Sequence, residues 1–345
     1  MIYKNFSLKK HNSFELDYKA DKFIVIKSID KFSELIEQKK ELAVPYFILG
    51  GGNNVLFTSD YNGVILHPAI EGIEIEKNDG KSVLVSAGAG VEWDSLVEWS
   101  VEKGLYGLEN LSHIPSSVGA TPVQNIGAYG REASEVIDKV VAININDGSI
   151  KTFTNEECCF NYRDSIFKRE LKNKYLIVKV FFKLSINGCF NLNYGSLEAE
   201  VNRLGGATLR NVRQAVINIR DSKLPNPKVL GNAGSFFKNP VVDSNKAGLL
   251  KSTFPELPVY EDKTGFVKLS AAWLIEKCGW KGKRQGDAGV HENQALVIVN
   301  YGKATGRQIF ELSEDIKRSV LEKFGVELES EVEIVGTLSE YSSSV

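Results

Sequence analysis

The chain of 345 residues is 43% hydrophobic and 25% charged, and its formal net charge is −2. This length is typical of two or three domains, and the near-neutral charge excludes a global basic field that would hold nucleic acid. The first residues contain no apolar run typical of a signal peptide, and no later segment is apolar over the length of a bilayer. We therefore expect a cytoplasmic protein without nucleic-acid or membrane partners.

Hydrophobic repeats in the first half of the chain predict alternating strands and helices. In chain order these are a strand at 22–28, a helix at 29–40, a strand–loop–strand unit at 45–57, a hairpin at 71–90 and a helix at 91–105. The hairpin turns at Asp79-Gly80, a pair typical of two-residue turns. The helix at 91–105 buries one face, formed by Trp93, Leu96, Val97 and Val101.

The second half continues the mixture of helices and strands. It predicts a hairpin at 140–154 that turns at Asp147-Gly148, a strand at 174–186, and helices at 208–220, 268–278 and 304–324. One face of the last helix carries Ile309, Leu312, Ile316 and Val320. The fold class is therefore α+β. A proline-rich stretch indicates a domain boundary near residue 225, and 337–345 is expected to be a flexible tail.

The cysteines and histidines favour neither a metal site nor a disulfide framework. No C-x-x-C pair is present among the four cysteines, and the four histidines are scattered along the sequence. Ser235 lies in NAGSFFK, which lacks the second glycine of the GxSxG turn of serine hydrolases. We therefore expect reduced thiols, no metal, and no Ser-His-Asp chemistry.

Two glycine-rich stretches are candidate ligand loops. Gly50 to Asn54 are five successive residues that tolerate positive φ and can aim N–H groups at phosphate oxygens. A tight turn explains that loop equally well. The stretch at 114–132 is long, and Val118, Val123 and Tyr129 make it too apolar for an exposed linker, which favours a ligand-cradling loop.

Seven segments, in this order, resemble the UDP-N-acetylenolpyruvoylglucosamine reductases (the MurB family) and their longer, type I branch. They span nearly the whole chain: ILGGGNNVLF, IPSSVGATPVQNIGAYG, NYRDSIFK, KLPNPKVLGNAGSFFKNPVV, AAWLIEKCGWKG, HENQALVIVN and LESEVEIVG. Any one segment alone would be weak support. Their common order makes a chance match very improbable.

The resemblance implies an FAD enzyme with the fold of vanillyl-alcohol-oxidase/PCMH-type flavoproteins. It implies a two-lobed FAD-binding region at 1–225, with lobes at 1–70 and 71–225, and a smaller α+β substrate-binding domain at 226–336. In this family NADPH reduces the flavin and is replaced at the same site by the enolpyruvyl UDP-sugar, which becomes UDP-N-acetylmuramate, a peptidoglycan precursor. Hydride goes to C3 and a proton to C2. We expect a monomer.

The resemblance also assigns three catalytic residues. Hydride addition at C3 moves negative charge toward C2 and the attached carboxylate, which a fixed cation stabilises. Arg163 matches the family's arginine for this task, Ser235 its proton donor to C2, and Glu331 its catalytic glutamate. From pattern alone, Arg163 forms a salt bridge with Asp164 or with another carboxylate at a strand end, Glu331 belongs to an acidic solvated strand face, and Ser235 caps or decorates a turn.

Further family positions match substrate and cofactor contacts. The substrate-binding positions are Tyr194, Lys223, Asn239 and Gln294. The flavin-binding positions are Gly50, Gly51, Gly52, Asn53, Asn54, Thr121, Val123, Gly127, Tyr129 and Arg220. The chain departs from the family pattern at Asn53, Ser116, Ala120-Thr121 and Ser330. If position 116 has positive φ, a serine there costs about 1 kcal/mol, and we expect FAD binding to be retained.

Two other functions remain open. One is a different flavin oxidase or dehydrogenase of the same fold, which need not contain Arg163, Ser235 and Glu331 together. The other is a non-catalytic nucleotide-binding regulator, which would keep the glycine loop without those three residues. Since all three residues are present, the reductase is favoured.

Overall fold

The computed structural model describes residues 1–37, 44–261 and 266–336. The chain forms two compact units, and neither is continuous in sequence. The first contains 1–6, 20–52 and 62–222, and the second contains 7–19, 53–61 and the chain from 223 onward. The tail expected at 337–345 and the end of the helix expected at 29–40 lie outside the described residues. No helix within the described ranges is long and apolar enough to cross a membrane.

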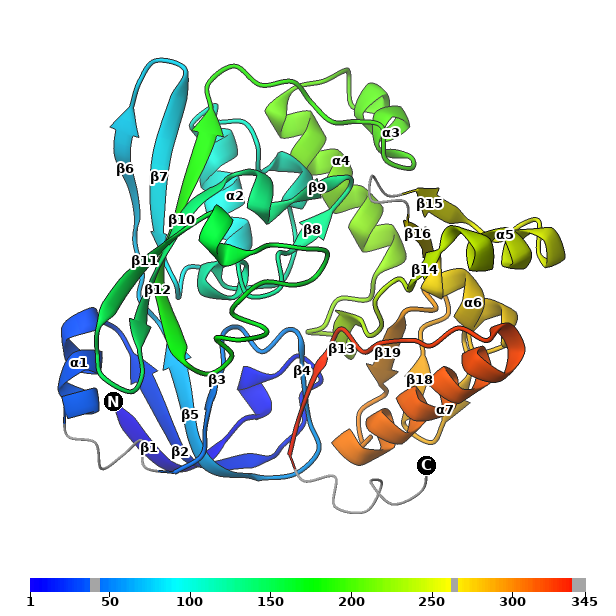
Figure 1. Ribbon diagram of the computed structural model, residues 1–345, viewed down its shortest axis with the longest axis horizontal. Helices are drawn as coiled ribbons and strands as arrows, with labels where there is room; N and C mark the ends of the chain where they lie inside the picture. Colours follow the sequence, from blue (N-terminus) through cyan, green and yellow to red (C-terminus); the bar gives the residue numbers. More distant parts are fainter. Residues whose placement is uncertain (38–43, 262–265, 337–345) are drawn as a thin grey trace. The chain divides into compact units, whose positions relative to one another are not determined.

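One sheet of the first unit is built from the N-terminal strands, with order β1-β2-β5-β3 (Figure 1). These strands are β1 (Ile2–Ser7), β2 (Lys19–Ile26), β3 (Tyr46–Ile48) and β5 (Tyr61–Pro68). Helix α1 (Ile29–Glu37) buries Phe32, Leu35 and Ile36 in the same core as Ile24 and Ile26 of β2. The apolar face of α1 therefore packs against this sheet.

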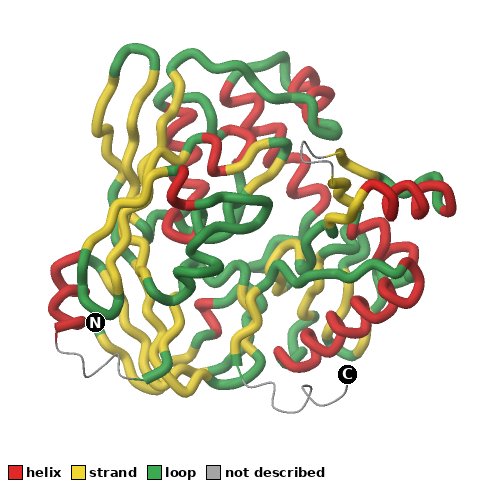
Figure 2. The backbone as a smooth tube through the Cα atoms, viewed as in Figure 1, coloured by secondary structure: helices red, strands yellow, loops and turns green. Residues whose placement is uncertain are grey.

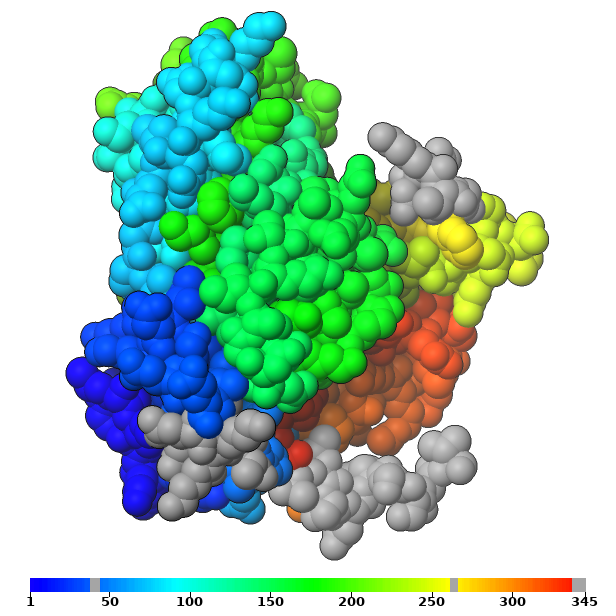
Figure 3. Space-filling model, turned by 60° about the vertical axis from the view of Figure 1, so that its left-hand side comes forward, coloured from blue at the N-terminus to red at the C-terminus, as the bar shows by residue number. Residues whose placement is uncertain are grey.

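The larger sheet of the first unit is antiparallel, with order β11-β10-β12-β7-β6. Its strands are β6 (Ile73–Asn78), β7 (Ser82–Gly88), β10 (Ile137–Asn144), β11 (Ile150–Thr154) and β12 (Tyr175–Ser185). Both predicted hairpins are confirmed, since β6 pairs with β7 and β10 with β11. Strand β6 is at the sheet edge and its side chains are mostly exposed; the cyan surface of Figure 3 includes this hairpin.

Helices and short 3-10 turns complete the first unit. These elements are α2 (Trp93–Glu102), α3 (Leu197–Arg203), α4 (Leu209–Lys223), η2 (Glu109–Leu111), η3 (Val118–Ala120), η4 (Ala133–Glu135) and η5 (Glu156–Cys158), with the small hairpin of β8 (Gly127–Ala128) and β9 (Arg131–Glu132). Trp93, Leu96, Val97 and Val101 of α2 are buried, as predicted. Helices α3 and α4 share a separate small core that Tyr129 joins.

The second unit contains antiparallel sheets with orders β13-β19-β18-β17 and β14-β16-β15. The elements are β13 (Gly231–Ser235), β14 (Val241–Asp243), α5 (Ser244–Thr253), β15 (Val259–Glu261), β16 (Phe266–Leu269), α6 (Ala271–Lys277), β17 (Arg284–Gln285), β18 (Ala288–Val290), β19 (Val297–Asn300) and α7 (Gly306–Phe324). Ile309, Leu312, Ile316 and Val320 of α7 are buried, as predicted. Helices and strands alternate along this unit in Figure 2.

Two segments from the N-terminal part of the chain complete the second unit. Strand β4 (Val55–Phe57) pairs in parallel with β20 (Glu333–Val335), the last strand. Phe14, Leu16 and Leu56 are buried in the same core as α6 and α7, and η1 (Lys9–His11) belongs to the first of these segments. The α+β class is confirmed, and no linear boundary separates the two units.

Candidate active site

Gly50 of the glycine loop packs closely against side chains of the long loop at 114–132 within the first unit. A Cβ on Gly50 would lie 2.8 Å from the Ser117 Oγ and 3.3 Å from the Ala120 Cβ, so only glycine fits without movement. Of the five residues from Gly50 to Asn54, only Gly52 has positive φ, at 69°. Close packing, more than backbone freedom, accounts for glycine at position 50.

The loop at 114–132 forms backbone hydrogen bonds with the start of α2 and with the residues just before it. The N–H of Trp93 donates to the Ser116 carbonyl at 3.0 Å, and the N–H of Gly119 donates to the Ala89 carbonyl at 2.9 Å. Thr121 is buried, and its hydroxyl donates to the Val118 carbonyl. Ser116 does not have positive φ, so the strain considered for this serine does not arise.

Tyr129 occupies a strained two-residue turn between β8 and β9. Its φ is 48° and that of Gly130 is 74°, which suits the type I′ geometry of tight hairpins. Its ring packs edge-on against Tyr194, with centroids 5.9 Å apart. Burial raises the pKa of Tyr129, although the nearby Arg220 opposes the increase. The first unit therefore brings together three residues predicted from the resemblance.

Two features of the first unit fit a large anionic cofactor such as FAD. The Ser117 Oγ is buried beside Gly50 without a hydrogen-bond partner in the described chain. Burial lowers the pKa of Arg220, and within the described residues only its Nε is hydrogen-bonded, to the His113 carbonyl at 2.9 Å. A buried hydroxyl and a desolvated guanidinium both need polar partners, which phosphate and flavin oxygens supply.

Arg163 is fixed to the same hairpin by its guanidinium group. Its Nη2 donates to the Gly127 carbonyl at 2.6 Å, and its Nη1 donates to the Asn125 carbonyl at 3.4 Å. The φ of Arg163 is 53°, an uncommon value for a residue other than glycine. Asp164, the next residue, forms an ion pair with Arg169 at 3.2 Å. Gly127 and Arg163, predicted separately, are thus in contact.

Ser235 ends β13 at a β-bulge in the second unit. The pairing of β13 with β19 shifts register between Asn232 and Ser235, and Gly234 within the shift has φ of 69°. The N–H of Gly234 donates to the Asn232 side chain at 2.9 Å, which closes this local turn. Bulges re-aim side chains beside functional sites, and this one sets the direction of the half-buried Ser235.

Glu331 lies on the chain segment that runs along the other side of Ser235. Its N–H donates to the Phe236 carbonyl at 2.8 Å, and Phe237 pairs with Ser330 in an antiparallel bridge. The Asn54 side chain donates to the Glu331 carbonyl at 3.0 Å. The second unit therefore places the Glu331 backbone, just before β20, beside the segment that follows Ser235 at the end of β13.

Burial in LESEVEIVG alternates as expected for a strand up to Glu329, whereas Glu331 and Glu333 are both half-buried. Leu328 and Val332 are buried, and Glu327 and Glu329 are exposed. Glu331 is half-buried, unlike those two glutamates. Lys238, three residues after Ser235, forms an ion pair with Glu329 at 2.9 Å.

The four substrate-binding candidates are divided between the units. Asn239 accepts the Ala271 N–H at 3.0 Å through its Oδ1, beside the start of α6. The Gln294 side chain accepts the Leu296 N–H at 3.3 Å. The Leu296 carbonyl in turn accepts the N–H of Phe236, the residue after Ser235, so Gln294 is linked to the Ser235 segment through Leu296. Lys223, the last residue of α4, is exposed. Tyr194, in the first unit, is 50% exposed.

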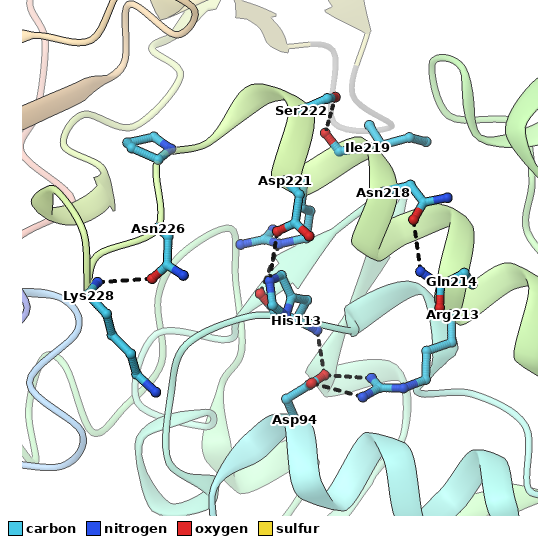
Figure 4. Close-up of polar contacts among 12 residues, drawn as sticks. Asp94, His113, Arg213, Gln214, Asn218, Ile219, Asp221, Ser222, Asn226 and Lys228 are labelled. Carbon is cyan, nitrogen blue, oxygen red and sulfur yellow. Dashed lines mark hydrogen bonds and ion pairs between the residues drawn. The ribbon is translucent and has the colours of Figure 1, made fainter.

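Several residues that hold the candidates were not found from the sequence. Asn125 is buried, has φ of 45°, and supplies a carbonyl to Arg163. Asp94, His113 and Arg213 form a polar cluster (Figure 4), and the His113 carbonyl accepts the Arg220 Nε–H. Their only sequence signal was polarity within apolar surroundings, because their partners lie far along the chain.

Comparisons with known proteins agree with this arrangement. Residues 20–154 match the family model described as FAD binding domain, and residues 226–335 match that of the UDP-N-acetylenolpyruvoylglucosamine reductase C-terminal domain. The UDP-N-acetylenolpyruvoylglucosamine reductase of Flavobacterium johnsoniae is 46% identical and aligns over 97% of this chain and 99% of its own. That of Pseudomonas aeruginosa is 45% identical over 94% of this chain and 96% of its own.

A solved structure shows the same fold. It is the UDP-N-acetylenolpyruvylglucosamine reductase (MurB) from Thermus caldophilus, with a TM-score of 0.66 at 23% identity, covering 97% of this chain and 98% of that one. The identity of the curated relatives extends over nearly the full length of both partners. The chain therefore belongs to the UDP-N-acetylenolpyruvoylglucosamine reductase family and is an oxidoreductase with FAD as its cofactor.

Proposed function

We propose that this enzyme reduces the enolpyruvyl double bond of UDP-N-acetylenolpyruvoylglucosamine with electrons from NADPH, giving UDP-N-acetylmuramate. The names of its relatives support the substrate, and the FAD binding domain match supports the cofactor. We assign FAD binding to 1–225 and substrate binding to 226–336. NADPH and the UDP-sugar use one site in turn.

The observation that carries this proposal is the pairing of the Ser235 and Glu331 segments. Two residues separated by nearly a hundred positions in sequence are held on adjacent segments by the hydrogen bond from the Glu331 N–H to the Phe236 carbonyl. A bulge at Gly234 and the Asn54 side chain fix the two backbones. This rigidity suits side chains that must act on one substrate atom.

Arg163 faces the charge that develops on the substrate in this proposal. As C3 gains a hydride, the electrons of the double bond move to C2 and into the carboxylate. A guanidinium anchored by the Gly127 carbonyl needs little reorganisation to stabilise that charge. Its planar donors match a carboxylate better than an ammonium group does.

Ser235 supplies the proton to C2. A hydroxyl is a weak acid, so it can serve only because the carbon it meets is strongly basic once the hydride has been added. Glu331 polarises the same region or assists that protonation. FAD, when bound, supplies the hydride.

An anaerobic experiment tests the proposed function. NADPH added to the yellow protein should bleach the flavin, and the enolpyruvyl UDP-sugar added next should restore the oxidised spectrum in stoichiometric amount. Bleaching without recovery on addition of this sugar would contradict the assigned substrate. Recovery with oxygen alone at a comparable rate would instead favour an oxidase.

Substitution of Ser235 by Ala separates the two half-reactions. We expect flavin reduction by NADPH to stay nearly unchanged, while reoxidation by the UDP-sugar slows by orders of magnitude because the proton donor is lost. Stopped-flow absorbance of the flavin measures both rates. Ser252→Ala, on α5 with its hydroxyl bonded to the Leu249 carbonyl, is the control. An equal loss in both half-reactions would return Ser235 to a structural role.

A further inference from the structure

His113 is a junction between three polar side chains of the first unit (Figure 4). Its N–H donates to the Asp94 carboxylate at 2.5 Å, its carbonyl accepts the Arg220 Nε–H at 2.9 Å, and its ring Nε2 lies 3.0 Å from the Asp221 carboxylate. The φ of His113 is 60°. Such a conformation costs about 1–3 kcal/mol at a residue other than glycine and persists only where contacts impose it.

Asp94 supplies the strongest of these contacts and is itself anchored. Arg213 of α4 donates to both carboxylate oxygens, at 2.6 and 2.9 Å, the bidentate geometry of strong ion pairs. Burial raises the pKa of Asp94, but the hydrogen bonds from Arg213 and from the His113 N–H outweigh burial and bring it below its ordinary value. Asp94 therefore stays ionised and joins α2, the loop at His113 and α4.

Arg220 is the group at the other end of this chain of contacts. It lies two helical turns beyond Arg213 on α4, and its guanidinium is held through Nε by the His113 carbonyl. Burial lowers its pKa, while Tyr129, Asp94 and Asp221 oppose the decrease. The Arg220 Nε–H is taken by the His113 carbonyl, which leaves the two terminal nitrogens as the donors that can bind a ligand.

We infer that Asp94 and Arg213 are positioning residues for Arg220 and that, through the strained His113 backbone, they set its contact with FAD. This inference rests on the proposed FAD contact of Arg220. Removal of the Asp94 charge weakens the hydrogen bond that holds the His113 N–H, which lets φ relax toward the ordinary region and moves the carbonyl that orients Arg220. The guanidinium then has to be ordered when FAD binds, which weakens binding.

Asp94 affects Arg220 through the backbone of His113 and not through its imidazole ring. The ring contact with Asp221 is exposed, with 46% and 63% of the two side chains accessible, so water replaces it at little cost. Asp221→Asn should therefore change FAD affinity much less than Asp94→Asn. The outer contact of Arg213 with Glu98, at 3.7 Å with Glu98 61% exposed, should likewise contribute little.

The test measures the FAD dissociation constant of reconstituted apoprotein by flavin fluorescence. We expect Asp94→Asn and Arg213→Gln each to raise it about tenfold, and the control Glu98→Gln to leave it unchanged. Arg213→Gln serves as the second variant if Asp94→Asn does not fold. Wild-type affinity in a folded Asp94→Asn protein would overturn the inference.

A double-mutant cycle separates positioning from a general loss of stability. If Asp94 acts through Arg220, Asp94→Asn should have almost no effect on FAD affinity in an Arg220→Gln background. A purely structural Asp94 predicts that the two effects add, which would overturn the inference. An Arg220→Gln protein that binds FAD as tightly as wild type would overturn it too. Loss of FAD binding by the wild type would contradict the cofactor itself, and is seen before any variant is made.

Discussion

Polar side chains bind backbone groups at three irregular positions near the candidate site residues. The Arg163 guanidinium donates to the Asn125 carbonyl, the Asn54 amide donates to the Glu331 carbonyl, and the Asp94 carboxylate accepts the His113 N–H. In each case one polar group fixes a carbonyl or an N–H that regular secondary structure leaves without a partner. Removal of one of these polar groups should therefore shift the neighbouring backbone and also lower the free energy of unfolding.

Asp94 makes the stability of the first unit depend on pH. Its pKa in the folded state lies below the ordinary value of 3.8, so the unfolded chain takes up a proton at higher pH than the folded chain does. The stabilisation is complete above the ordinary pKa and is lost as pH falls through the folded one.

Asp94→Asn should lower the free energy of unfolding by about 1–3 kcal/mol at pH 7, because it removes a charge-assisted pair. The difference from wild type should shrink below about pH 4, where the wild-type carboxylate also becomes protonated. Denaturant titrations across pH measure it. A difference that does not change down to pH 2 would contradict the assignment of ionised Asp94.

Asn110 ties the turn at Tyr129 to the segment that leads to Tyr194. Its side-chain nitrogen donates to the Tyr129 carbonyl at 2.9 Å and the Asn191 carbonyl at 2.8 Å, and the residue is 1% exposed. Asn110→Asp would replace the donor by an acceptor facing two carbonyls. We expect it to cost about 2–4 kcal/mol of stability, measured by chemical denaturation.

The control for Asn110 is a neighbouring amide with a weaker role. Asn191 donates through its side chain to the Gly130 carbonyl at 3.0 Å on the surface. Asn191→Ala should cost less than about 1 kcal/mol. If Asn191→Ala proves as damaging as Asn110→Asp, the stability of the turn does not depend on the buried amide.

At the scale of elements, helix α7 begins where its backbone touches β4. A Cβ on Gly306 would overlap the Phe57 carbonyl oxygen, and the Gly306 N–H donates to the Tyr18 hydroxyl at 3.2 Å. Thr305 and Gln308 form a capping box at the same helix start. The first residue of α7 is thus small because β4 lies against it.

Gly306→Ala should destabilise the protein by about 1–3 kcal/mol, since either α7 or β4 must move. Thermal and chemical unfolding measure the change. The matched control is Gly248→Ala on α5, where nothing lies within 4 Å of the added carbon, and where we expect a gain of up to about 1 kcal/mol in helix propensity. Equal effects at both sites would contradict the close approach of β4.

The regular elements were the part of the fold that local sequence predicts well. Asp79-Gly80 and Asp147-Gly148 marked the two confirmed hairpins, and the spacing of Ile309, Leu312 and Ile316 marked the buried face of α7. These signals depend on neighbours within a few residues. The loop at 114–132 was less predictable, since its hydrogen bonds go to Ala89, Val91 and Trp93.

At the scale of the whole chain, each unit is assembled from separated segments. Phe14, Leu16 and Leu56 lie in the core of the second unit, and β4 is the only strand paired with β20 among the described residues. A fragment of 223–336 would expose that core and the edge of β20. The C-terminal region therefore needs its N-terminal segments to fold.

We expect the fragment 223–336, expressed alone, to show no cooperative thermal transition by circular dichroism. A matched chain that joins 7–19, 53–61 and 223–336 through flexible linkers should regain one, because it restores the missing core residues and β4. A sharp transition of the short fragment would contradict the role of the N-terminal segments.

The sequence by itself determined the α+β class, most helices and hairpins, and, through the order of its motifs, the reductase family. Those features depend on local periodicity and on residue patterns that can be compared directly. The tertiary structure alone decided that the strand carrying Ser235 pairs beside Glu331, that Arg163 contacts Gly127, and that Asp94 reaches His113. Each of these contacts joins residues distant in sequence, and such pairings depend on the packing of whole elements, which no short window of sequence contains.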